Sequence, residues 1–219
     1  MKRGLDVFRA VPVLEPEERV ESIACLGEVL YVGGQLGSVI QYDLGSGGGG
    51  EEPGAGAAKK TAIVRLGTRK PVEQVQAASG IVLALSDGLV HVLSEDIQTT
   101  PAVVLCREAK CVCFHTGREE SIEGVGLPTE ICVSFRKKLT LYTHSGRAFE
   151  QRQEFPTSEA ATALVWHRSW ICAGFRKEYN LYSDRAGVPR EICHLDGKVT
   201  PQIAVVAGGG APPPRGGRG

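Results

Sequence analysis

The sequence lacks both an excess of one charge and any long apolar run. Its 25 basic and 25 acidic side chains balance, whereas proteins that follow a phosphate backbone usually carry a basic excess. No apolar run approaches the roughly 18 residues of a membrane-spanning helix, and the basic start is not followed by the apolar stretch of a signal peptide. We therefore expect no nucleic-acid partner, no transmembrane segment, and a cytoplasmic chain that is recruited to any membrane at which it works.

Recognisable catalytic and cofactor motifs are also missing. No Cys-x-x-Cys or His-Glu-x-x-His pattern occurs. The glycines of residues 33–37 are not followed by the Gly-Lys-Ser/Thr of a phosphate-binding loop, so we assign them to a β-turn. No spacing between a cysteine and a histidine singles out a nucleophilic dyad. We expect a non-enzymatic protein with no cofactor and no metal site.

The alternating run Cys111, Cys113 and His115 invites comparison with a metal site. On a strand these side chains point to one face, about 6.6–6.8 Å apart from one to the next. The outer two then stand about 13 Å apart, too far to share an ion bound at about 2.0–2.3 Å. The pattern favours a core strand instead. The seven cysteines are dispersed and odd in number, which indicates reduced thiols and not a secreted disulfide framework.

The sequence does contain one hairpin pattern four times. Each copy has an apolar strand, a short polar or glycine turn, a second apolar strand, and a terminal aromatic or aliphatic residue. The copies lie at residues 30–42, 81–92, 131–142 and 171–182, and their spacing of about 40–50 residues is typical of propeller blades. The last two align without a gap, ICVSFRKKLTLY on ICAGFRKEYNLY.

Further strands flank each hairpin. An apolar strand is predicted before each one, at residues 20–26, 72–78, 109–115 and 160–166. A weaker or more polar strand is predicted after each one, at residues 62–66, 102–106, 149–155 and 190–195. Four antiparallel strands per repeat, with almost no helical periodicity, predict an all-β fold: a partial β-propeller of about four to five four-stranded antiparallel blades.

Two glycine-rich segments interrupt this pattern. We assign residues 45–58 to a flexible insertion in a loop of the propeller and residues 207–219 to a disordered Gly/Pro/Arg-rich tail, which leaves one domain over residues 1–206. Residues 200–206 are predicted to open a fifth blade. A propeller closes at typically 4–8 blades. The chain is therefore a small ring or the first part of a larger one, and we favour the second, with an exposed terminal blade prone to aggregate.

The repeats resemble the citron-homology (CNH) domain. The likeness rests on residues 8–14 (FRAVPVL), 30–39 (LYVGGQLGSV), 131–139 and 171–179, and it runs over about residues 7–206. The sequence is most similar to the CNH domain at the start of the vacuolar-sorting subunits of the HOPS and CORVET complexes and of the TGF-β-receptor-associated protein family. The resemblance implies a propeller of about seven blades followed by an α-solenoid, of which this sequence has only the first part. It also implies binding to a Rab-type small GTPase and to tethering-complex subunits at endosomes, vacuoles or lysosomes.

Candidate partner-binding residues lie in two neighbouring hairpin turns. Arg136, Lys137 and Lys138 recur one blade later as Arg176 and Lys177. Equivalent turns of adjacent blades emerge on one face of a propeller, so these cations are expected to share a surface. They either serve solubility alone or form an electropositive platform for an acidic GTPase surface or an anionic membrane surface.

The two tryptophans differ in their surroundings. Trp166 ends an apolar strand, which assigns it to the core. Trp170 follows a polar turn and is a candidate for a partly exposed anchor of a partner.

Three other functional classes stay open beside vesicle tethering. They are a generic propeller scaffold of the WD-repeat kind, the regulatory CNH domain of a kinase or Rho-exchange protein, and a propeller enzyme. The blades lack the Trp-Asp ending and Gly-His start of WD repeats, and the innermost strands offer mainly apolar side chains where an enzyme would need converging polar ones. The leading interpretation is a non-catalytic interaction module.

Overall fold

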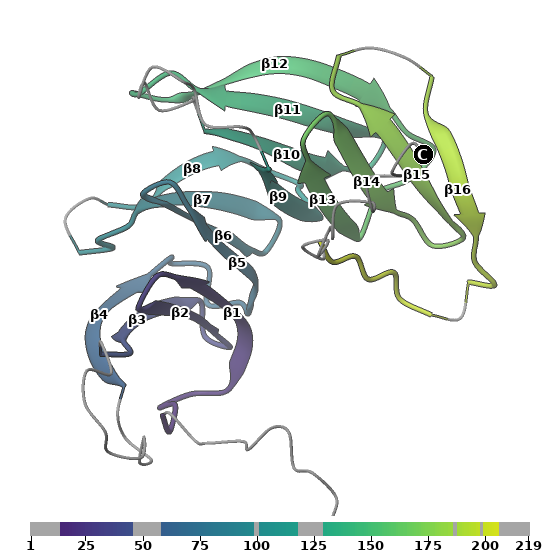
Figure 1. The fold of residues 1–219 in the computed structure, drawn as a ribbon. Coiled ribbons are helices and arrows are strands. Elements are labelled where there is room, and N and C mark those ends of the chain that lie inside the picture. The colour runs from purple at the N-terminus through teal and green to yellow at the C-terminus, as the bar shows by residue number, and fades with distance from the viewer. Residues whose placement is uncertain are drawn as a thin grey trace, which may run out of the picture.

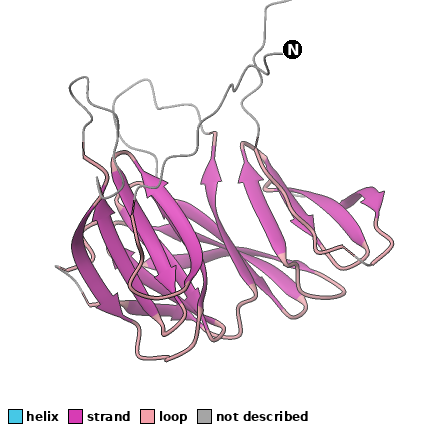
Figure 2. Ribbon diagram, turned by 90° about the horizontal axis from the view of Figure 1, so that it is seen from below, coloured by secondary structure: helices cyan, strands magenta, loops and turns pink. Residues whose placement is uncertain are grey.

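The computed structural model describes residues 14–45, 58–98, 101–117, 129–185, 188–197 and 199–205. Within these ranges the chain forms sixteen β-strands and no helix (Figure 2), which confirms the all-β prediction. Accordingly, no helix that could span a membrane is found in the described ranges. The predicted tail and most of the predicted insertion lie outside them, as does the opening of the chain up to residue 13.

The strands form four antiparallel meanders, each of which is one propeller blade. Blade 1 consists of β1 (Val20–Leu26), β2 (Val29–Gly34), β3 (Ser38–Asp43) and β4 (Lys59–Arg65), and blade 2 of β5 (Val72–Ala78), β6 (Ile81–Ser86), β7 (Leu89–Ser94) and β8 (Val103–Cys106). Blade 3 consists of β9 (Cys111–Thr116), β10 (Glu130–Phe135), β11 (Lys138–His144) and β12 (Phe149–Pro156), and blade 4 of β13 (Ala163–His167), β14 (Trp170–Gly174), β15 (Glu178–Ser183) and β16 (Arg190–His194). Figure 1 shows the blades following one another in an arc, with blades 1 and 4 at its two ends.

Two inner strands begin later than predicted. β9 begins at Cys111 and β13 at Ala163, two and three residues after the predicted starts. Ala109 and Ala161 are buried, with 2% and 0% exposure, yet the Ala109 N–H donates to Gly88 O at 2.9 Å, outside any ladder. These two positions are buried because the connections between blades pack against the preceding hairpins. An apolar residue in such a connection looks the same in the sequence as an apolar residue in a strand.

The hairpin between β6 and β7 illustrates why the turns form where they do. Asp87 and Gly88 both have positive φ, 53° and 71°. This is the geometry of a type I′ turn, which matches the right-handed twist of the flanking strands, and Asp and Gly tolerate it well. The two strands pair without a bulge from Ile81↔Ser94 to Ser86↔Leu89, so the two-residue loop sets the register.

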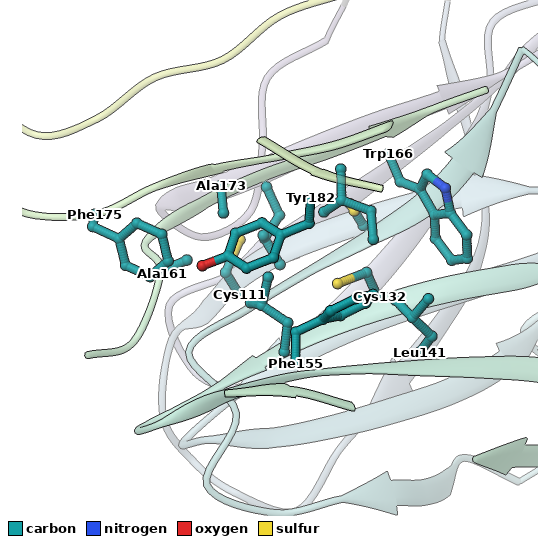
Figure 3. Packing of buried hydrophobic residues seen from close by; sticks show 13 residues of the cluster. Cys111, Cys132, Leu141, Phe155, Ala161, Trp166, Ala173, Phe175 and Tyr182 are labelled. Atoms are coloured by element: carbon teal, nitrogen blue, oxygen red, sulfur yellow. The ribbon is translucent and has the colours of Figure 1, made fainter. Parts of the chain in front are cut away.

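A buried apolar cluster fills each interface between successive blades. The cluster between blades 3 and 4 includes Cys132, Phe155, Trp166 and Tyr182 (Figure 3), and similar clusters join blades 1 and 2 and blades 2 and 3. Because the middle strands are buried on both faces, they are apolar almost throughout instead of alternating; β6, with the sequence IVLALS, is an example.

Side-chain amides reinforce the interface between blades 2 and 3. Gln74 Nε2 donates to Val112 O at 2.8 Å, and the Val112 N–H donates back to Gln74 Oε1 at 3.0 Å. The Phe114 N–H donates to Gln76 Oε1 at 3.1 Å. Two glutamines of β5 thereby satisfy backbone groups on the inner edge of β9. Beyond this point β9 pairs in parallel with β13 at Trp166↔His115, which joins blades 3 and 4 into one eight-stranded sheet.

The predicted opening strand of a fifth blade is not a strand over its described residues, 200–205. It nevertheless lies where such a strand would lie. A Cβ built on Gly174 would stand 2.6 Å from Pro201 Cβ, just as a Cβ built on Gly33 would stand 2.9 Å from Val72 Cβ at the start of β5. Pro201 therefore packs on blade 4 as β5 packs on blade 1, but the described chain holds no second strand of a fifth blade with which it could pair.

Candidate functional site

The cationic turns, Arg136–Lys137 and Arg176–Lys177, connect the two middle strands of blades 3 and 4. All four residues are exposed. Within the described ranges none of the four side chains forms an ion pair. Their charges are therefore available to a partner.

The connection between the two blades brings the cationic turns together. The Thr157 N–H donates to Lys137 O at 2.9 Å, and two residues later Glu159 Oε1 accepts a hydrogen bond from the Arg176 N–H at 3.0 Å. Thr157 Oγ1 also donates to Glu159 O at 2.7 Å, which holds this short link in shape. The two turns are neighbours on one face of the protein, as the repeat predicted.

Lys138, the fifth predicted cation, is not free like the other four. Its ammonium group pairs with Glu154 on the adjacent strand β12 and lies 5.6 Å from the centroid of the Phe135 ring. Acidic groups also reach the neighbouring turn, because Glu159 and Glu178 line a pocket of about 370 Å³ together with Arg176. The candidate surface thus reduces to four cations with carboxylates between them.

Trp170 lies at the other end of blade 4 from the cationic turns. It begins β14, whereas the turn with Arg176 follows the end of that strand at Gly174. The strand alone separates the two by roughly 13 Å at about 3.3 Å per residue. Trp170 is 50% exposed and Trp166 fully buried. The core assignment of Trp166 is confirmed, and Trp170 cannot belong to the same small site as the cationic turns.

A buried ion-pair cluster joins blades 3 and 4 at the end where Trp170 lies. The Glu130 carboxylate, whose side chain is 3% exposed, lies 2.7 Å from Arg152 Nη1 and 3.0 Å from His115 Nδ1. Thr143 Oγ1 donates to it at 3.1 Å. The His115 ring stacks on Trp166 with 4.2 Å between centroids and 5° between planes. With several partners, the charge of Glu130 is compensated in spite of its burial.

Beside this cluster is a cleft of about 400 Å³ that sequence reasoning missed. It is lined by His115, Gly117, Arg152, Arg168, Ser169, Asp184 and Arg185. Two of these residues lie on strands, His115 on β9 and Arg152 on β12, and the others lie in the segments that follow β9, β13 and β15. None of them by itself marks a site in the sequence. Only the shared position of turns in successive repeats could have suggested that they meet.

The buried thiols between blades 3 and 4 are poor nucleophiles. Burial raises the pKa of Cys111 to about 12. Burial, assisted by Cys113, also raises the pKa of Cys132 well above its ordinary value. The thiolate is the reactive form, and a raised pKa disfavours it at neutral pH.

The described residues contain one group of side chains close enough together to hold a metal ion. Ligand atoms of Glu178, Glu191 and His194 lie within 4.8 Å of one another. The group sits on the outer strands of blade 4, two of its members are exposed, and Glu178 already accepts a hydrogen bond from Asn180 at 2.8 Å. In the same described ranges, Cys111, Cys113 and His115 form no such group.

Known proteins resemble the chain over most of its length. Mouse (Mus musculus) Vam6/Vps39-like protein is 25% identical over 222 residues, which cover 93% of this chain and 24% of that protein. Human (Homo sapiens) transforming growth factor-beta receptor-associated protein 1 is 24% identical, with 86% of this chain and 23% of that protein covered. The chain thus spans about a quarter of the length of these relatives. No protein-family model matches it.

Solved structures agree with this relationship at the level of the fold. The AfRom2 CNH domain superposes with a TM-score of 0.57 at 11% identity, covering 83% of this chain and 57% of that domain. The WD40 β-propeller domain of Doa1 gives a TM-score of 0.55 at 12% identity, covering 81% of this chain and 55% of that domain. At these identities the likeness concerns the β-propeller fold alone. The resemblance read from the repeats is confirmed: the chain is a homologue of the Vam6/Vps39-like and TGF-β-receptor-associated proteins.

Proposed function

We propose that this chain is a non-catalytic protein-interaction module of a HOPS/CORVET-type complex that tethers vesicles at endosomal, vacuolar or lysosomal membranes. The observation that carries the proposal is its homology to Vam6/Vps39-like protein over 93% of the chain. In this proposal residues 1–206 are one propeller domain with an insertion at 45–58, residues 207–219 are a tail, and the protein is cytoplasmic and bound peripherally to the membrane.

The cationic turns are the proposed contact for a Rab-type small GTPase. Four exposed cations on two adjacent turns complement an acidic protein surface, which speeds encounter and selects orientation. Glu159 and Glu178 lie beside these cations. They disfavour a partner with a uniformly negative surface, because both carboxylates would then face negative charge on that partner. This mixed pattern favours a folded partner with both signs of charge over an anionic membrane surface.

The test reverses all four charges in the full chain, as R136E, K137E, R176E and K177E together. Binding to a panel of GTP-analogue-loaded Rab proteins is measured by surface plasmon resonance, and binding to liposomes with 30% phosphatidylserine by flotation. Exposed pairs contribute roughly 0.2–1 kcal/mol each, and reversal adds repulsion. We therefore expect at least a tenfold loss of Rab affinity, since about 1.4 kcal/mol corresponds to tenfold.

The matched control reverses four exposed cations elsewhere, Lys59, Arg65, Arg147 and Arg190, and so changes net charge equally. It should retain Rab binding. Unchanged Rab affinity in the cationic-turn variant would remove these turns from the interface, and equal losses in both variants would reduce the effect to net charge. Loss of liposome binding alone would assign the turns to the membrane and overturn the GTPase contact.

A further inference from the structure

The cleft between blades 3 and 4 gathers guanidinium groups from separate elements. Arg152 comes from β12, Arg168 from the turn between β13 and β14, and Arg185 from the segment after β15. Arg152 forms an ion pair with Glu130. Arg168 and Arg185 are exposed, and neither forms an ion pair within the described ranges. Among the described residues, therefore, the mouth of the cleft carries two positive charges that form no ion pair.

Hydrogen bonds hold the turns that carry these charges. The Arg168 N–H donates to Thr116 O at 2.8 Å, and His115 Nε2 lies 2.5 Å from Arg168 O. The Asp184 N–H donates to Ser169 O at 3.0 Å, and Arg152 Nη2 lies 3.4 Å from Asp184 O. The backbone around the cleft is thus shaped before any partner arrives, which lowers the entropy cost of binding.

The buried side chain of Asp184 also points to a ligand in this cleft. It lines the cleft with only 8% exposure, and its Oδ1 atom is buried without a hydrogen-bond partner among the described residues. Unsatisfied buried polar atoms are rare in folded proteins and destabilise the folded state, more so when they are charged. Because Oδ1 is covered in the free protein, a ligand reaches it only by displacing the side chains over it, and an N–H or O–H donor placed there would remove that destabilisation.

We propose that this arginine cleft is a docking site for an acidic peptide segment of a partner protein. Its carboxylates would pair with Arg168 and Arg185 at the mouth, and a backbone N–H would donate to Asp184 inside. A polyphosphate or lipid headgroup fits less well, because its dense negative charge would face the Asp184 carboxylate with few donors to offer. Trp170 directly follows Ser169 of the cleft and is half exposed, which provides an aromatic anchor of the kind enriched at interface hot spots.

The inference is independent of the Rab contact, since the cleft and the cationic turns lie at opposite ends of blade 4. It is tested on the full chain with a fluorescein-labelled, end-blocked hexaglutamate peptide by fluorescence anisotropy, with labelled hexalysine as the charge control and inorganic phosphate as competitor. The double variant R168E/R185E should bind hexaglutamate at least tenfold more weakly. The K59E/R65E control, which reverses two exposed cations of blade 1, and the cationic-turn variant should bind it as the unmodified chain does.

Asp184→Ala separates a peptide site from a simple anion site. If the carboxylate accepts a backbone N–H, its removal weakens hexaglutamate binding several-fold, while thermal unfolding shows stability unchanged or raised because an unsatisfied buried group is lost. Stronger hexaglutamate binding by D184A, or complete displacement of the peptide by millimolar phosphate, would overturn the peptide proposal in favour of simple anion attraction. Equal binding by the R168E/R185E variant and the unmodified chain would overturn the site itself.

Discussion

Trp166→Ala should destabilise the protein far more than Trp170→Ala, although the two tryptophans belong to one hairpin. Trp166 is fully buried, belongs to the apolar cluster between blades 3 and 4, and stacks on His115. It also forms one of the two residue pairs through which β13 joins β9. Its removal therefore opens a cavity at the junction of two blades.

The size of the effect follows from burial. Replacing a buried Trp by Ala typically costs about 3–5 kcal/mol, and loss of the stacked ring pair places Trp166 in the upper part of that range. For a chain of this length, about 1 kcal/mol shifts Tm by roughly 2–4 °C, so we expect a drop of roughly 8–20 °C. Replacing Trp170, which is 50% exposed, by Ala should cost about 1 kcal/mol or less of folding stability.

Trp166→Phe provides an internal check. Among the residues that the structure describes, the indole Nε1 has no hydrogen-bond partner, so phenylalanine loses volume but no hydrogen bond, and its ring can still stack on His115. Its Tm should fall between those of the unmodified chain and W166A. Circular dichroism at 218 nm during heating measures all three, and the emission of W170F reports on Trp166 alone, which should be blue-shifted. Equal Tm values for W166A and W170A would refute the assignment of Trp166 to the core between the blades.

Two further predictions concern packing and pH. Gly33→Ala should lower the urea midpoint by the equivalent of about 1–3 kcal/mol, because the new Cβ would stand 2.9 Å from Val72 Cβ and Cγ1; an unchanged midpoint would show that blades 1 and 2 can separate at no cost. Burial, with Glu95 and Asp96, raises the pKa of Tyr31 to about 12. Above about pH 10 the unfolded chain loses a proton that the folded chain keeps, so the free energy of unfolding falls as pH rises. Tyr31→Phe should show a smaller fall between about pH 10 and pH 12, and an equal fall would exclude Tyr31 as its source.

The order and type of the strands are readable from the sequence because they depend on local pattern. Apolar runs broken by turns such as Asp87-Gly88, together with the weaker or more polar run after each hairpin, predicted all sixteen strands to within three residues of their observed bounds. The repeat of Arg136-Lys137 as Arg176-Lys177 also predicted that the two turns emerge side by side. Both inferences need only near neighbours along the chain and the rule that equivalent positions of a repeat fall at equivalent places.

Contacts between residues far apart in the chain were decided by the tertiary structure. Lys138 looked like its neighbours in the sequence, yet the pairing of β11 with β12 places Glu154 beside it. The arginine cleft depends on four segments of blades 3 and 4 that meet only when the blades stack. Spacing along the chain sets which face of a strand a side chain occupies, but it carries no information about what the next blade presents to that face. For this reason the sequence by itself determined the blades, and only their packing decided which charges are paired and which remain open to a partner.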